Sequence, residues 1–86
     1  MKDTASITER DMIAEKQTVK IRRDRMQIYP PATGRLLDGR KGRVIEVFVP
    51  LGTKEAVVKV RWFARRPSEN ELTMEHPISD LEIIPN

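Results

Sequence analysis

Two β-branched runs separated by a turn-forming segment constrain the fold of this chain more than any other feature. Residues 43–49 read RVIEVFV, residues 55–63 read EAVVKVRWF, and PLGTK lies between them. Runs of this composition, bounded by Pro and Gly, predict two strands joined as a hairpin. The fold must therefore be organised around this antiparallel pair.

Shorter segments of strand character flank the hairpin. Strands are expected at residues 19–22, 26–28, 71–75 and 82–84, with a single helical turn at 78–81. Tyr29-Pro30-Pro31 marks a loop or an edge, because consecutive prolines supply no ladder N–H groups. Several short strands broken by turns predict one mostly-β domain over residues 18–86, built as a small, strongly bent barrel.

Residues 1–17 are expected to precede this barrel as an arm or a short helix. Ser6 and Glu9 have the spacing of a capping box, and Ile7, Met12 and Ile13 form a thin apolar stripe. A helix this short is marginal without packing. A docked helix and a disordered arm therefore both stay open.

Alternation along the two strong strands predicts which side chains face the core. In residues 55–63 the inward set is Ala56, Val58, Val60 and Trp62. In residues 43–49, one face carries Ile45, Val47 and Val49, and the other carries Val44, Glu46 and Phe48. Phe48, Val57 and Phe63 are then expected on the outer face. A partly apolar outer face needs a cover: the N-terminal segment, a second subunit or a partner protein.

Charge is polarised along the chain, although the net charge is only +3. Nine Lys or Arg residues lie between residues 16 and 43, where only two acids oppose them, whereas residues 67–86 carry five acids and no base. The pattern fits either a polyanionic partner or two segments that neutralise each other in the fold. Neutralisation of the basic loop Arg40-Lys41-Gly42-Arg43 by Glu75, Asp80 or Glu82 would remove the case for binding.

Composition excludes several classes of site. The 86 residues include no Cys and a single His, so a disulfide framework, a thiolate nucleophile and a Cys or multi-histidine metal site are excluded. His76, beside Pro77 in an expected loop, has no catalytic partners in the sequence, and a P-loop is lacking. No apolar run approaches the ~18 residues of a membrane span, and no secretory signal is visible. We expect a soluble, cytoplasmic protein that is not an enzyme and has no cofactor.

The basic run before the first strong strand resembles a known motif. Gly39-Arg40-Lys41-Gly42-Arg43-Val44-Ile45-Glu46-Val47 is similar to the KOW motif, and residues 19–21, 58–63 and 78–84 resemble elements of SH3-like barrels. The resemblance covers roughly residues 18–85 and implies an SH3-like β-barrel. KOW domains of ribosomal proteins and transcription elongation factors contact RNA or protein, and Tudor-like modules and small accessory subunits with the same barrel plan bind proteins. The long segment 22–37 departs from a compact ribosomal KOW domain.

The basic residues in and near this motif are candidate phosphate ligands. Charge and the bidentate geometry of Arg suit phosphate oxygens, and Tyr29 could stack on a base. Gly42 permits a close approach of the backbone where the loop enters the strand. The candidates are Arg22, Arg23, Arg25, Tyr29, Arg35, Arg40, Lys41 and Arg43. The expected function is a non-enzymatic module that holds the phosphates of RNA or DNA with little sequence specificity. The alternative is that these residues form only a solvated, charged rim.

Protein docking is the alternative function. Phe48, Val57 and Phe63 would contact a protein partner, with the chain acting as an accessory subunit, regulator or inhibitor, or as one half of a homodimer. On the same face, Lys59 and Arg61 are expected to pair across strands with Glu46 or Glu75. Trp62 is expected in the core, with its indole N–H bonded to a backbone carbonyl.

Overall fold

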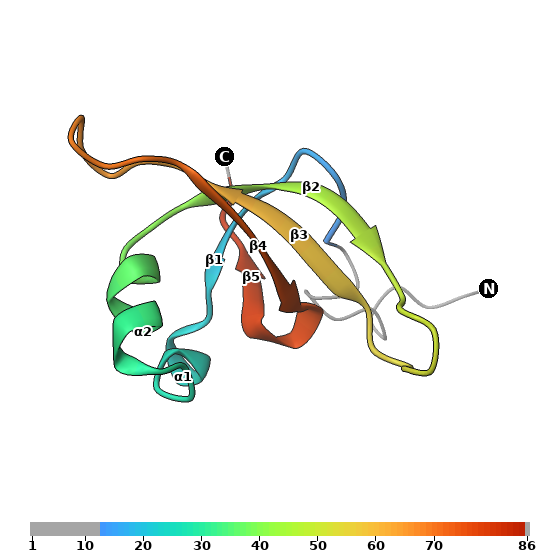
Figure 1. The fold of residues 1–86 in the computed structure, drawn as a ribbon. Helices are drawn as coiled ribbons and strands as arrows, with labels where there is room; N and C mark the ends of the chain where they lie inside the picture. The colour runs from blue at the N-terminus through green and yellow to red at the C-terminus, as the bar shows by residue number, and fades with distance from the viewer. Residues whose placement is uncertain (1–12, 86) are drawn as a thin grey trace.

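The computed structural model describes residues 13–85, which form one five-stranded antiparallel sheet and two short helices (Figure 1). The elements are β1 (Thr18–Ile21), α1 (Arg23–Met26), α2 (Pro31–Leu37), β2 (Gly42–Phe48), β3 (Val57–Trp62), β4 (Leu72–Pro77), the 3-10 turn η3 (Ile78–Asp80) and β5 (Leu81–Ile83). The strand order is β4-β3-β2-β1-β5. The expected class, a small mostly-β domain of about five short strands, is confirmed.

The sheet curls around one apolar core. In Figure 1, β1 and β5 lie behind β3 and β4. Side chains from both ends of the sheet meet, because Leu81 of β5 belongs to the buried cluster and Met74 of β4 packs against it. The buried cluster contains Ile13, Val19, Ile21, Leu37, Val44, Val58, Val60, Trp62 and Leu81. Trp62 is fully buried at its centre. Burial of this one cluster, contributed by four strands, helix α2 and Ile13 of the segment before β1, stabilises the fold.

A β-bulge in β2 changes the predicted inward set of that strand. The pairing with β3 shifts between Val44 and Glu46, so Val44 faces the core and Ile45 is 39% exposed. After the bulge, Val47 lies opposite the buried Val58, as expected. The assignment of Val44 to the outer face and Ile45 to the core is therefore wrong, because an extra residue reverses the alternation. Phe48 remains on the outer face.

The long segment between β1 and β2 is helical rather than extended. A strand was expected around Met26 and Ile28, but residues 23–26 form α1 and residues 31–37 form α2. Pro31 occupies the first turn of α2, where a missing N–H costs nothing and the fixed φ suits a helix. Tyr29 and Pro30 thus lie in a loop between α1 and α2, as expected, and Pro31 begins α2.

The segment before β1 runs along the sheet. Lys16 N–H donates to Val44 O at 2.8 Å, and Val44 N–H donates to Gln17 O at 2.9 Å. Ile13 is 6% exposed and belongs to the core. The expected capping box at Ser6 and the stripe at Ile7 and Met12 lie outside the described residues. Over residues 13–85, no helix has the length and apolar character needed to cross a membrane.

Candidate functional site

Arg40, the first basic residue of the KOW-like run, is a buried structural residue. It is 1% exposed, and its guanidinium donates to the carbonyl oxygens of Phe63 at 2.7 Å, Leu36 at 3.1 Å and Asn70 at 2.5 Å. Glu69 Oε1 lies 3.4 Å from Arg40 Nη2. The expectation that Arg40 lies on a solvated rim is therefore wrong, because three carbonyls at the end of α2 and around the β3–β4 loop consume its donors.

Arg25 and Tyr29 also bind within the fold. Arg25 Nε donates to Asp80 Oδ1 at 3.0 Å, and the Tyr29 hydroxyl donates to Asp80 Oδ2 at 2.7 Å. Burial and the hydrogen bond to Asp80 raise the pKa of Tyr29 above its usual value. The Tyr29 ring lies against His76, with 5.9 Å between ring centroids. These contacts occupy both side chains and explain why neither lies in a basic rim.

His76 connects this group to the core. Trp62 Nε1 donates to His76 Nε2 at 3.0 Å, and His76 Nδ1 lies 2.9 Å from the Tyr29 hydroxyl. An indole nitrogen only donates, so Nε2 must accept and the neutral ring carries its proton on Nδ1. Burial lowers the pKa of His76 to about 4. The expectations of a loop histidine and of a backbone acceptor for Trp62 are both wrong, because β4 extends to Pro77 and carries His76 beneath Trp62.

Acidic residues of the C-terminal segment neutralise part of the basic segment. Asp80 pairs with Arg25, and Glu82 lies 3.6 Å from Lys20. Within its own turn, Arg22 pairs with Asp24 at 3.2 Å. The expected pair of Lys59 with Glu46 is present at 3.9 Å. Neutralisation therefore accounts for the charge of Lys20, Arg22 and Arg25.

Other cations of the basic segment have no acidic partner in residues 13–85. They are Lys16, Arg23, Arg35, Lys41 and Arg43. All five are exposed. Glu75, Asp80 and Glu82, the acids that test the binding case, make no ion pair with Arg40, Lys41 or Arg43. The charge beside the KOW-like run thus faces solvent without compensation.

A cleft of about 390 Å³ gathers part of this charge. It lies between β1, α1 and the turn that follows α2, and it is lined by Lys20, Ile21, Arg23, Met26, Leu37, Asp38, Gly39, Arg40 and Lys41. Three exposed cations, Lys20, Arg23 and Lys41, stand on its rim. Asp38 is the one acid in the lining. We name this site the basic cleft; its arrangement suits an anion, because positive charges gathered in a cleft concentrate the electrostatic field there.

A second hollow adjoins the basic cleft. It has a volume of about 340 Å³ and is lined by Gly39, Lys41, Phe63, Ala64 and Arg65, so Gly39 and Lys41 belong to both sites. Arg65 is held by Glu69 through its Nε at 3.0 Å and donates to the carbonyl oxygens of Arg35 and Asp38. Lys41 is therefore the cation that the two sites share and that remains unpaired.

The eight predicted ligands are thus separated by the fold. Arg23 and Lys41 face the basic cleft, Arg35 is exposed on α2, Arg43 is on the outer face of β2, and Arg22, Arg25, Tyr29 and Arg40 make the contacts described above. Lys20 lines the cleft and was not predicted, because its alternation in β1 identified only an exposed strand residue. The alternation does not predict the helices within residues 23–37, which bring Arg23 beside Lys20.

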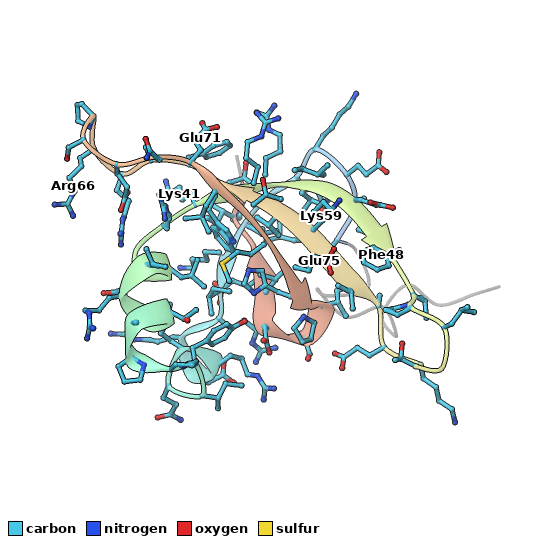
Figure 2. The ribbon with its side chains drawn as sticks, in the orientation of Figure 1. Lys41, Phe48, Lys59, Arg66, Glu71 and Glu75 are labelled. Carbon is cyan, nitrogen blue, oxygen red and sulfur yellow. The ribbon has the colours of Figure 1, made fainter. Side chains whose placement is uncertain are left out.

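The three residues of the alternative interface are not one patch. Phe48 and Val57 are direct cross-strand partners at one end of the β2–β3 hairpin. Phe63 follows β3 at the other end, beside Lys41, whereas Figure 2 shows Phe48 at the far end of β2 from Lys41. All three side chains are half-buried. An interface that uses all three would have to cover the whole length of the hairpin.

Comparison of the chain with protein-family models, curated proteins and solved structures finds no significant match. The similarity of residues 39–47 to the KOW motif stays a prediction.

Proposed function

We propose that this chain is a cytoplasmic, non-enzymatic nucleic-acid-binding module that holds the phosphate backbone in the basic cleft with little sequence readout. The proposal rests on Arg23 and Lys41, which line one cleft and have no acidic partner in residues 13–85; Lys20 lines the same cleft but pairs with Glu82. Phosphate oxygens are strong acceptors for such cations, and binding releases counterions from the nucleic acid. In the lining there is no aromatic side chain and no Asn or Gln, the residues that stack on or read bases.

Lys41 is the central contact in this proposal. Its backbone carbonyl accepts the Phe63 N–H at 2.9 Å, which fixes the loop, while its side chain is exposed. Two residues of the KOW-like run then have different roles: the buried Arg40 holds the loop in place, and the Lys41 side chain projects from it. Gly42 allows the loop to enter β2 over the core, because a Cβ there would lie 2.5 Å from Val60 Cγ1.

Salt dependence of binding tests the proposal. Lys41→Gln and Arg23→Gln should each weaken binding of a labelled oligonucleotide and lower the slope of log K against log salt by about 1. Lys54→Gln is the matched control, since Lys54 is exposed in the loop between β2 and β3. Affinity that does not change with salt, or an equal loss in the Lys54 variant, would contradict a phosphate site in the cleft.

Protein docking at the hairpin end remains the second candidate, favoured by a separate observation. Leu51 is fully exposed and Val49 is 58% exposed, next to the half-buried Phe48 and Val57. A contiguous exposed apolar group of this kind is typical of a contact surface. Light scattering tests whether the partner is a second copy of the chain. A wild-type dimer that Leu51→Lys converts to a monomer would support a homodimer, and a monomeric wild-type protein would contradict it.

A further inference from the structure

The outer face of the hairpin carries a repulsive pair that no internal contact explains. Arg43 of β2 and Arg61 of β3 are direct cross-strand partners, and both are exposed. Like charges in this position destabilise a sheet. Neither arginine has an acidic partner in the part of the chain that the structure describes. An external anion is the contact that would relieve this repulsion.

Phe63 stands between this pair and Lys41. The Arg43 guanidinium lies 6.0 Å from the centroid of the Phe63 ring, and the same ring lines the second hollow with Lys41. Phe63 is half-buried, so part of the ring is open to solvent. An open aromatic ring flanked by two unpaired cations has the composition of a site that stacks one base and holds the phosphates on either side of it.

We propose that the ligand is single-stranded, with one base packed against Phe63 in the second hollow while Lys41 and Arg43 hold the flanking phosphates. This inference rests on the proposed function and adds the form of the nucleic acid to it. The path runs from the basic cleft past Lys41 to the Arg43–Arg61 pair, because the two hollows share Gly39 and Lys41. In a duplex the bases are stacked inside and cannot reach the ring. The ring and phosphate contacts are common to DNA and RNA, so single strands of both are expected to bind.

Fluorescence anisotropy with labelled oligonucleotides of about a dozen residues tests the inference. Single-stranded DNA and single-stranded RNA should each bind more tightly than a duplex of the same sequence. Phe63→Leu should weaken single-strand binding about tenfold, since stacking on one ring contributes roughly 1–3 kcal/mol per base, and should leave duplex binding unchanged. Phe48→Leu is the matched control: it changes the other phenylalanine, at the opposite end of the hairpin, and should have no effect.

An abasic oligonucleotide provides a test that needs no protein variant. It keeps the phosphates and lacks the bases, so it should bind about as weakly as the intact strand binds the Phe63→Leu protein. Equal affinity for intact and abasic strands, or for single strands and duplex, would overturn the single-strand inference and leave phosphate binding in place. No binding of any of these probes at low salt would instead overturn the proposed function itself.

Discussion

At the residue scale, one glycine shows how tightly the start of β2 packs on the core. A Cβ at Gly42 would lie 2.5 Å from Val60 Cγ1, 2.8 Å from Trp62 Cε3 and 3.0 Å from the Arg61 carbonyl oxygen. Two of these atoms belong to fully buried side chains that cannot move aside. The second glycine of the KOW-like run is therefore required by packing, whatever the loop binds.

We expect Gly42→Ala to lower the free energy of unfolding by about 1–3 kcal/mol, the usual cost of overpacking a core. Gly34→Ala is the control, since Gly34 is in α2 and a Cβ there meets nothing within 4 Å. It should stabilise the protein by about 0.5–1 kcal/mol, because alanine is the better helix former. Denaturant unfolding measures both, and equal effects would contradict the packing argument.

His76 should make stability depend on pH. Its pKa is lowered to about 4 in the fold by burial, from an ordinary value near 6.5. The unfolded chain therefore binds the additional proton between pH 6.5 and 4, and stability falls as the pH decreases through that range. The loss should reach roughly 3 kcal/mol. Denaturant unfolding at several pH values measures it, and His76→Asn should remove most of the slope; an unchanged slope in the variant would assign it to carboxylates.

At the element scale, most strands and the helical turn at residues 78–81 could be predicted from the sequence, whereas helices α1 and α2 could not. The β2–β3 hairpin and the last strands follow from β-branched runs between turns, which is local information. Met26 and Ile28 provide two alternating positions, too few to distinguish a strand from the helical turn that the chain adopts. Likewise, the burial of Arg40 depends on the carbonyls of Leu36, Phe63 and Asn70, which only the fold brings together. Charge along the sequence thus predicted a basic site, but not which basic residues form it.

Removal of Arg40 should damage the connection between α2 and the β3–β4 loop. Arg40→Met removes a buried guanidinium, which leaves three part-buried carbonyls without this donor and Glu69 without one of its two arginines, and we expect a loss of about 3–5 kcal/mol. Arg66→Met, at an exposed position of that loop, should have little effect. Thermal unfolding distinguishes them. A mild effect at Arg40 would mean that water replaces its hydrogen bonds.

At the scale of the whole molecule, some charged residues pair within the fold and others remain unpaired. Acids of the C-terminal segment brace β1, α1 and the loops through Lys20, Arg25 and Arg40, and the cations that remain free lie around the basic cleft and the outer end of the hairpin. The polarity of the sequence is therefore neither wholly neutralised nor wholly exposed. The neutralisation interpretation therefore holds for Lys20, Arg25 and Arg40, and the polyanion interpretation stays a prediction for the cations without an acidic partner in residues 13–85.

The opposed pair of Arg43 and Arg61 gives the free protein and its complex opposite responses to ionic strength. Added salt screens the repulsion between the two guanidinium groups, so the melting temperature of the free protein should rise modestly with salt. A bound polyanion contributes its stabilisation by mass action, and this contribution declines as salt weakens binding. The two melting curves should therefore converge at high salt, and the ionic strength at which they meet would report how far the surface depends on its ligand for electrostatic balance.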